Sequence, residues 1–399
     1  MAWKETRVFD EKVRFMAAFL DENDHRSMTE LCHAFGVSRN TGYEVLARFR
    51  EGGFEALRAR PRAPLHHANI TAPELEDLVV AARLAHSKWG PKKLLEILRV
   101  RHPKISNWPA VSTAGQILKR RGLVVPRKTR HRTPPYTQPL AHALRPNDVW
   151  TTDHKGCFRT GDRAYCVPLT IGDAMSRFHF ELRAVTSTSV DTAWPHFEHA
   201  FRVYGLPARI RSDNGAPFAS RGLGGLTRLS AWWIKLGILP ERIEPGCPDQ
   251  NGRHERFHLT MDQEVGIRAS LAAQQRAYDF FLAEYNHVRP HESLGMRTPA
   301  SVYESSHRPY PSKLRPMEYP SRFEVRLVRR KGEVKWQGDL MYLSEGLAGE
   351  LVGFERVSDR EWRVSFGPVP LAVYDEKTRK LRRPPRRQLP APEAPGEIK

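Results

Sequence analysis

Three acidic residues stand where a metal-dependent phosphodiester enzyme would need them. Asp153 ends the apolar run VWTTDH, Asp213 lies in ARIRSDNG, and Glu255 lies in DQNGRHERFHLT, which reads as a loop entering a helix. Magnesium is a hard cation that prefers oxygen ligands and keeps part of its water shell, so a few carboxylates and substrate phosphate oxygens suffice to hold it. We therefore expect these three acids to share two magnesium ions.

The chemistry that such a site supports is phosphodiester transfer. Two metal ions about 3.5–4 Å apart activate the attacking oxygen and neutralise the departing one. Asp153 and Asp213 fall at or just past the ends of apolar runs, so adjacent strands would place them at the same edge of a sheet. The pair Asn214-Gly215 would turn the backbone away from that edge. Glu255 would approach from a helix.

Other acids and histidines have simpler interpretations. Asp173 in TIGDAMSRF is expected to stabilise a turn, and Asp262, two helical turns after Glu255, is not expected to touch the site. His287 and His291 have the spacing of a zinc pair, but the proline between them breaks the regular helix that this spacing requires.

Residues beside the acids have two open interpretations each. His154 and Lys155 would orient phosphate or water, or simply lie at the surface. His254 and His258 would shuttle protons, although water on a metal needs no shuttle.

Composition restricts the class of protein. With 399 residues and 40% hydrophobic content, roughly two to three globular domains are expected. No stretch approaches the ~20 apolar residues of a membrane span, and the start MAWKETRVFDEKVRF lacks the apolar segment of a signal peptide. Four cysteines without a CxxC pair indicate neither a disulfide framework nor structural zinc. We expect a cytoplasmic protein.

The net charge of +19 is concentrated in the flanks of the chain. Residues 1–145 carry +12, residues 146–305 carry zero, and residues 306–399 carry +7. Lysine and arginine that neutralise phosphates release counterions and so bind nucleic acid of any sequence. A basic flank alone is also compatible with an ordinary solvated surface. The neutral centre favours nucleic acid, because a site built from acids must take its DNA affinity from elsewhere.

The first segment, residues 1–60, has the pattern of a helix-turn-helix domain. In MTELCHAFGVSRNTGYEVLARFRE, Thr29 is the expected N-cap of one helix, Gly36 ends it, and Ser38 caps a second helix that runs to Arg50. The alternative is a helical hairpin that packs only on itself. If the second helix is a recognition helix, the residues facing base edges would be Arg39, Asn40 and Tyr43. Those facing phosphates would be Arg48 and Arg50.

Residues 66–125 predict a second helical DNA-binding domain. Three helical patterns follow one another, and the last ends in the basic run Lys119-Arg120-Arg121. Residues 126–145 then form a basic, proline-containing linker that would lie along a phosphate backbone or serve as an ordinary linker.

The remaining chain predicts a core, a small β domain and a tail. Residues 146–305 show three strand-like runs and then helix-strand alternation, which indicates an α/β fold with a mixed sheet covered by helices. Residues 320–376 consist of short alternating runs typical of a small antiparallel β-barrel. The basic tail, residues 377–399, has too little apolar content to fold. In the core, Trp232-Trp233 is most simply a packing pair, and Arg253 and Arg256, beside Glu255, are candidates for DNA contact.

Four stretches resemble bacterial insertion-sequence transposases with a retroviral-integrase-like catalytic core: NDVWTTDH, IRSDNGAPFAS, PGCPDQNGRHERFH and YNHVRPHESLGMRTPASVY. With the helix-turn-helix start, the resemblance extends to about Tyr303. It implies a ribonuclease-H-like fold and an Asp-Asp-Glu triad of Asp153, Asp213 and Glu255 that uses Mg2+ or Mn2+. One departure is a longer gap between the second and third acids, which contains GLGGLTRLSAWW. Loop insertions cost little, so the triad is unaffected but the role of this loop is open.

The resulting hypothesis is a DNA transposase. It would bind terminal inverted repeats through its N-terminal helical units, hydrolyse the phosphodiester at the element's end and transfer the strand to target DNA. The resemblance implies double-stranded DNA partners, at least a dimer on DNA, and a bacterial, nucleoid-associated location. The alternatives are a nuclease that hydrolyses without joining and a DNA-binding regulator derived from the same fold.

Overall fold

A computed structural model describes residues 8–58, 70–125, 140, 142–220, 222–243 and 252–384. The chain divides into two compact units, residues 1–70 and residues 71–399. Most of the expected basic linker, 126–145, and of the expected tail, 377–399, lies outside the described ranges, as does Cys247. Cys32, Cys157 and Cys166 are free thiols. Within the described part of the chain, no helix has the length and apolar character required to cross a bilayer.

The first unit is the expected helix-turn-helix domain. Its helices are α1 (Val8–Leu20), α2 (Met28–Ala34), α3 (Arg39–Gly52) and the 3-10 turn η1 (Gly53–Leu57). Ser38 caps α3 as predicted, accepting a 3.2 Å hydrogen bond from the Thr41 amide. The prediction of Thr29 as the cap of α2 is wrong. Ser27 has that role, because it forms a capping box with Glu30, in which each side chain bonds the other's backbone amide.

A second helical group opens the second unit. It contains α4 (Pro73–Ala85), α5 (Pro91–Arg101) and α6 (Val111–Arg120). Pro73 and Pro91 lie in the first turns of their helices, where the missing amide proton costs nothing. Leu94, Leu95 and Leu118 are buried in the core that the three helices share.

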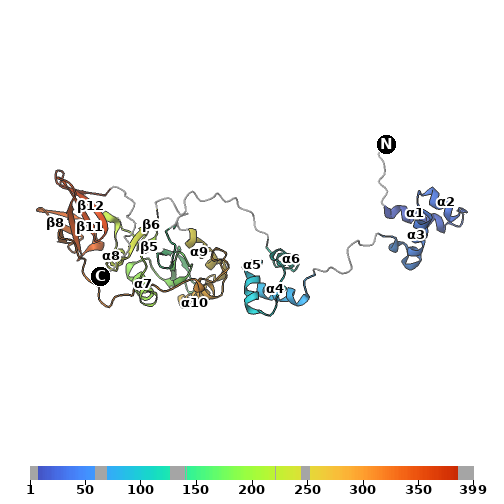
Figure 1. The fold of residues 1–399 in the computed structure, drawn as a ribbon, viewed down its shortest axis with the longest axis horizontal. Helices are drawn as coiled ribbons and strands as arrows, with labels where there is room; N and C mark the ends of the chain where they lie inside the picture. The colour runs from blue at the N-terminus through green and yellow to red at the C-terminus, as the bar shows by residue number, and fades with distance from the viewer. Residues whose placement is uncertain are drawn as a thin grey trace. The chain divides into compact units, whose positions relative to one another are not determined.

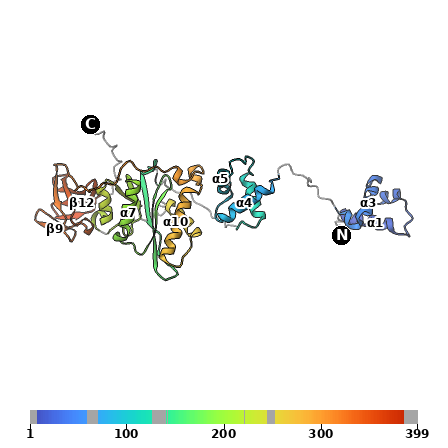
Figure 2. The same cartoon turned by 90° about the horizontal axis from the view of Figure 1, so that it is seen from below.

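Residues 149–242 contain a mixed sheet (Figure 2). Its strands are β1 (Val149–His154), β2 (Phe158–Arg159), β3 (Tyr165–Asp173), β4 (His179–Val185), β5 (Arg209–Ser212) and β6 (Leu239–Arg242). They follow the order β2-β3-β1-β5-β6, with β4 also paired to β3. Strands β1 and β5 are parallel, as are β5 and β6. Strands β1, β3, β4 and β5 were predicted and are confirmed, whereas β6 was not predicted.

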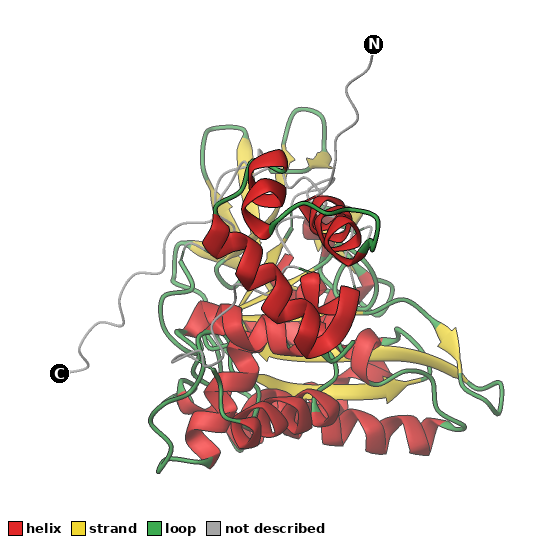
Figure 3. Cartoon of the chain, turned by 90° about the vertical axis from the view of Figure 1, so that its right-hand side faces the viewer, coloured by secondary structure: helices red, strands yellow, loops and turns green. Residues whose placement is uncertain are grey.

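Helices cover both faces of this sheet (Figures 2 and 3). They are α7 (Val190–Tyr204), α8 (Arg228–Lys235), α9 (Gly252–Glu264) and α10 (Leu271–His287). One face packs Trp150 and Ile210 against α7 and α8, and Trp232 and Trp233 belong to that core as predicted. The other face packs Cys166 and other side chains against α9 and α10. Because side chains alternate along a strand, the residues next to Trp150 and Ile210 in sequence point towards the α9 face.

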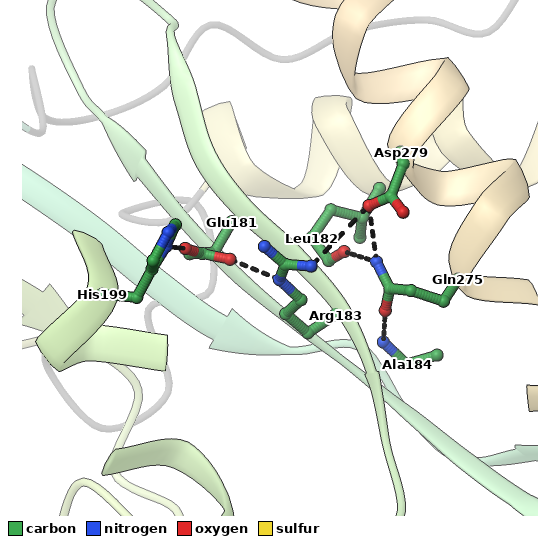
Figure 4. Close-up of polar contacts among 7 residues, drawn as sticks. All are labelled: Glu181, Leu182, Arg183, Ala184, His199, Gln275 and Asp279. Carbon is green, nitrogen blue, oxygen red and sulfur yellow. Dashed lines mark hydrogen bonds and ion pairs between the residues drawn. The ribbon is translucent and has the colours of Figure 1, made fainter. Parts of the chain in front are cut away.

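The outer edge of β4 is closed by side chains of α10 rather than by another strand (Figure 4). Gln275 accepts a 2.8 Å hydrogen bond from the Ala184 amide and donates a 3.0 Å bond to the Leu182 carbonyl. Asn286 makes the equivalent pair of bonds to the backbone of His179, at 3.0 and 2.8 Å. Two amide side chains therefore complete an edge whose free backbone groups would otherwise be unsatisfied.

A buried carboxylate lies on the same strand. Glu181 has no exposed side-chain surface and pairs at 2.5 Å with Arg183 of β4 and with His199 of α7. Figure 4 shows the two partners on either side of this carboxylate, with Asp279 of α10 beyond Arg183. Pairing with two cationic or hydrogen-bonding groups is what allows a carboxylate to be buried in a sheet.

The C-terminal β module, residues 320–384, is not the closed barrel that the sequence predicted. Its strands are β7 (Phe323–Leu327), β8 (Glu333–Trp336), β9 (Asp339–Tyr342), β10 (Leu351–Arg356), β11 (Glu361–Phe366), β12 (Val369–Asp375) and β13 (Lys380–Arg382). They form an open sheet, β13-β12-β11-β10-β7, and a separate hairpin, β8-β9. The hairpin packs on the sheet instead of closing it, with Trp336 stacked on Phe354 at a centroid distance of 4.0 Å.

Strand β13 also corrects the predicted start of the disordered tail. Lys380–Arg382 pair with β12, and Leu381 packs against the core of the module. One apolar side chain and an available strand edge are enough to order this basic segment.

The closed edge of β4 yields a stability prediction. Replacing Gln275 with Leu should lower the free energy of unfolding by about 1–3 kcal/mol, because one backbone amide and one carbonyl lose their hydrogen-bond partner. Chemical denaturation followed by circular dichroism measures this change. The neighbouring exposed residue provides the control, since Arg276→Ala should change the value by less than about 0.5 kcal/mol. Equal stability of the two variants would show that the amide does not support the edge.

Candidate active site

The sheet brings Asp153 and Asp213 to the same level on neighbouring strands. Strands β1 and β5 are parallel, and Thr151 is in register with Arg211. Two residues further on, the same register places Asp153 opposite Asp213, just past the end of β5. Because Trp150 and Ile210 face α7 and α8, both acids point towards the α9 side of the sheet.

Helix α9 brings Glu255 to that side through the residue before it. His254 is buried, and its ring nitrogens bond the hydroxyls of Thr151 on β1, at 3.0 Å, and Thr170 on β3. The Thr170 hydroxyl in turn donates to the Asp153 carbonyl at 3.0 Å. One hydroxyl therefore joins the strand that carries the first acid to the helix that carries the third.

A second histidine on α9 reinforces this junction. His258 lies one turn after His254 and contacts Thr170 at 3.1 Å through Nε2. Its Nδ1 lies 3.8 Å from a carboxylate oxygen of Asp153. Burial lowers the pKa of His258 to about 3, so the ring is neutral at pH 7. The two histidines thus have the contacts of anchors for α9, and the proposed proton-shuttle role has no observation in its favour.

The three acids interact electrostatically. Burial, the charge of Asp213 and the charge of Glu255 together raise the pKa of Asp153 to about 7, against an opposing backbone hydrogen bond. Burial also raises the pKa of Asp213. Glu255 lies in the first turn of α9 and is exposed. Like charges this close favour protonation or a bound cation.

The donor set fits a hard divalent cation. One carboxylate oxygen of Asp213, Oδ1, is buried without a hydrogen-bond partner in the described part of the chain, and a metal ion would supply one. All three candidate ligands are anionic oxygen donors, which Mg2+ prefers. In this conformation, however, no group of three or more His, Cys, Asp and Glu side chains among the described residues is arranged to hold a metal. Of the three acids, Asp153 and Asp213 are carried by neighbouring strands of the sheet and Glu255 by α9.

Gly215 has a direct steric reason to follow Asp213. A Cβ atom at this position would lie 2.8 Å from Asp213 Oδ2, closer than real Cβ atoms come. The pKa of Asp213 is also influenced by a hydrogen bond from the Gly215 backbone, which opposes the effect of burial. The predicted turn at Asn214-Gly215 therefore keeps the carboxylate unobstructed.

Asp173 has the turn role that the sequence predicted. It is buried at the end of β3, where its carboxylate accepts hydrogen bonds from the amides of Asn147, at 2.8 Å, and Ser176, at 2.7 Å. Arg253 belongs to this neighbourhood. Its guanidinium donates to the Ala174 carbonyl at 2.7 Å, and burial and nearby arginines lower its pKa to about 10. This contact holds the start of α9 against the sheet.

The remaining residues beside the acids are accounted for by packing and ion pairing. Lys155 forms an ion pair with Asp262. His154 is half-buried and stacks on Phe218 at a centroid distance of 5.6 Å, and partial burial lowers its pKa to about 4. His291 packs edge-on against a tyrosine of α10.

The candidate DNA-contacting residues of α3 fall into two structural groups. Arg39, Asn40 and Tyr43 are exposed at its N-terminal end, and half of the Tyr43 surface is accessible. Arg50 is exposed near the other end. Arg48 differs, because its guanidinium donates hydrogen bonds to the backbone carbonyls of Ala56 in η1, at 2.6 Å, and of Arg58 just after η1, at 2.5 Å. Those bonds hold η1 against the helix.

The basic residues at the end of α6 are exposed but paired. Lys119 is exposed, Arg120 forms a 2.5 Å ion pair with Glu76 of α4, and Arg121 lies 3.4 Å from Asp77. Arg256 on α9 is exposed.

Sequence reasoning missed the threonines that connect the acids. Thr151 and Thr170 are buried and bond His254, yet neither is unusual in a strand. The available signal was a polar residue at alternate positions of apolar runs, Thr151 and Asp153 in VWTTDH, which marks one face of the strand as polar.

The raised pKa of Asp153 predicts a pH-dependent stability difference. Between about pH 4 and pH 7 the unfolded chain releases this proton while the folded chain keeps it, so ionisation lowers the free energy of unfolding as pH rises. At pH 8 without divalent metal, the free energy of unfolding of Asp153→Asn should therefore exceed that of the parent chain by about 1–3 kcal/mol. Denaturant titration measures this difference. The difference should vanish near pH 4. The exposed Asp359→Asn serves as control, and equal stability at pH 8 would contradict the electrostatic account.

Comparison with known protein families agrees with this architecture. Residues 143–248 and 236–299 each match an integrase core domain family. Residues 11–64 match a helix-turn-helix domain family, and residues 41–118 match a homeodomain-like domain family.

Individual relatives point the same way. The chain is 26% identical over 255 residues to the insertion element IS476 uncharacterized 39.2 kDa protein of Xanthomonas euvesicatoria, covering 62% of this chain and 70% of that protein. It is 26% identical over 265 residues to the insertion element IS407 uncharacterized 31.7 kDa protein of Burkholderia multivorans (strain ATCC 17616 / 249), covering 62% and 87%.

Among solved structures, the HTLV-2 integrase catalytic core domain in complex with magnesium matches at 16% identity and TM-score 0.32, covering 40% of this chain and 99% of that one. A simian T-cell lymphotropic virus intasome chain matches at 17% and 0.34, covering 73% and 96%. These scores are low, so the assignment rests on the sequence families. Two segments of the chain thus match integrase core domain families, an earlier segment matches a helix-turn-helix domain family, and the chain is similar to two proteins of bacterial insertion elements.

Proposed function

We propose that this protein is a DNA transposase that binds the terminal inverted repeats of its element, hydrolyses the phosphodiester at each end and transfers the strand to target DNA. One observation carries the proposal. The register of the parallel strands β1 and β5, continued two residues beyond Thr151 and Arg211, puts Asp153 level with Asp213, and the charges of Asp213 and Glu255 help raise the pKa of Asp153. Two half-buried acids that repel each other favour the binding of cations.

The residues of the site would have separate roles in metal binding and in support. Asp153, Asp213 and Glu255 would hold two Mg2+ or Mn2+ ions, which activate the attacking oxygen and neutralise the leaving one. Glu255 is exposed in the first turn of α9. It would therefore bind the metal ions after Asp153 and Asp213 have bound them. His254 and Thr170 hold the helix and the strand together while this occurs. The 3′-hydroxyl released by hydrolysis would then attack target DNA at the same acids.

DNA binding would come from the basic flanks. The exposed N-terminal residues of α3, Arg39, Asn40 and Tyr43, would read base edges in the major groove. Arg50, Lys119 and Arg256 would contact phosphates. Arg120, Arg121, Arg253 and Arg48 would do so only by giving up the contacts described above. Two ends must meet for strand transfer, so we propose at least a dimer on DNA, acting in the bacterial cytoplasm on nucleoid DNA.

The triad gives the first test of this function. Asp153→Asn, Asp213→Asn and Glu255→Gln should each reduce strand transfer by at least about a thousandfold, because each removes a charged ligand. Gel assays with labelled transposon ends and Mg2+ measure hydrolysis and joining separately. End binding, measured by mobility shift, should stay within about twofold of the parent chain. The control is Asp191→Asn in α7, an exposed acid.

The same assay separates the alternatives. Hydrolysis without joined products would indicate a nuclease, and end binding without any metal-dependent cleavage would indicate a regulator. Full strand transfer by any one triad variant would remove that residue from the site.

The recognition helix gives a second test. Asn40→Ala or Arg39→Ala should weaken binding to the element's ends by about 1–3 kcal/mol per lost base contact, with little change for unrelated DNA. Fluorescence anisotropy with end and scrambled duplexes measures both affinities. Glu44→Ala, on the same helix, serves as the control. Equal losses on both duplexes would mean that these residues contact phosphates only.

A further inference from the structure

The glycine loop, residues 222–227, lies between Asp213 and Glu255, in the stretch where the resemblance to insertion-sequence transposases predicts a shorter gap. Its sequence, GLGGLT, includes the turn η2 (Leu223–Gly225). An insertion without a role would be expected to lie exposed at the surface. Here Leu226 is buried in the core of the C-terminal β module and Leu223 packs against that core; Figure 1 shows helix α8, which follows the loop, beside the module.

Apolar side chains join the loop to the module. Leu226 is 2% exposed and belongs to one continuous core with Val328, Phe354 and Leu371 of the module. Ala231 and Ile234 of α8 belong to the same core. The catalytic domain and the β module therefore share a hydrophobic core at this loop.

Backbone contacts fix the position of the loop on the module. The Leu223 amide donates to the Leu343 carbonyl at 3.0 Å. The Ser344 hydroxyl donates to the Leu226 carbonyl at 3.1 Å. Lys235 at the end of α8 adds a 2.8 Å ion pair with Glu350. These contacts specify one docked arrangement, which apolar packing alone would not do.

The glycines of the loop are explained by this close approach. Gly224 has φ +70°, and a Cβ atom there would lie 2.5 Å from a methyl carbon of Leu371 and 3.2 Å from its Cα. On the other side of the contact, a Cβ at Gly346 would lie 2.6 Å from the Leu226 carbonyl oxygen. Side chains at either position would separate the two backbones.

The same part of the loop is also bonded to the segment that follows Asp213. Ser220 donates through its amide to the Gly225 carbonyl at 2.9 Å and through its hydroxyl to the Leu226 carbonyl at 2.8 Å. Arg242 of β6 also donates to the Gly225 carbonyl. On the sheet, Arg242 is in register with Ser212, the residue before Asp213. The loop is thus held from both sides of the second acid.

We propose that the C-terminal β module is a positioning element of the active site, which holds Asp213 in place through the glycine loop. This inference rests on the proposed role of Asp213 in metal binding and catalysis. The module contributes no ligand and need not touch DNA for this purpose. Loss of docking should therefore lower turnover and metal affinity while leaving DNA-end affinity unchanged.

The experiment compares two glycine substitutions in the full chain. Gly224→Ala introduces the clash with Leu371, whereas Gly338→Ala, in the β8-β9 turn, has a similar positive φ of +89° with no atom within 4 Å of the new Cβ. Both variants carry similar backbone strain, but only the first disturbs docking. Three quantities are measured for each variant: Mn2+ binding by calorimetry, hydrogen exchange of the amides of residues 213–226, and strand-transfer kinetics.

The expected result is specific to Gly224→Ala. Exchange at residues 218–226 becomes faster, Mn2+ affinity falls by about fivefold or more, and the rate of strand transfer falls by about tenfold or more, since small displacements of reacting groups are costly. End affinity stays within about twofold. Gly338→Ala behaves like the parent chain. If Gly224→Ala matches Gly338→Ala in metal affinity and rate, the proposal is overturned.

Two outcomes keep this test separate from the proposed function. If the parent chain shows no strand transfer, the function fails, and Mn2+ binding with hydrogen exchange still decides whether docking positions Asp213. If Gly224→Ala speeds exchange throughout β10–β12, the module itself has been damaged. Ser344→Ala, which removes the hydrogen bond to the Leu226 carbonyl together with the bond that the same hydroxyl accepts from the Gly346 amide, then replaces it. A loss of about threefold in Mn2+ affinity supports the proposal, and no loss overturns it.

Discussion

Close approach of two carboxylates on neighbouring parallel strands is the constraint around which the rest of the core is built. Asp153 and Asp213 face the same side of the sheet, and burial and repulsion raise the pKa of Asp153 to about 7. When both carboxylates are ionised, their repulsion destabilises the folded state. The surrounding structure must therefore supply stability elsewhere, and it must leave a place for positive charge.

The supporting contacts are directional hydrogen bonds. His254 bonds threonines of two strands, Arg253 bonds a backbone carbonyl near the Asp173 turn, and Gln275 completes the outer edge of β4. None of these three contacts is made to the carboxylates of Asp153 or Asp213. The site consequently combines a rigid sheet with an exposed third acid on α9.

Regular elements were predictable where one local pattern governed them. The alternating and apolar runs of β1, β3 and β4 gave the strands, and Ser38 gave the start of α3. Strand β6 was missed because LPER has neither alternation nor β-branched residues, and only pairing with β5 makes it a strand. The expected barrel is an open sheet because the hairpin β8-β9 packs on its face. Closure depends on packing between strands, which local patterns do not contain.

By itself, the sequence determined the types of the candidate catalytic residues, their order along the chain, and the separation of a neutral core from basic flanks. Covalent order and composition suffice for those properties. Only the tertiary structure decided which residues support the acids, because Thr151, Thr170 and the glycine loop acquire their roles from partners distant in sequence. It also decided that Arg48 and Arg253 bond backbone carbonyls. A side chain's partner is set by what folding brings within about 3 Å of it.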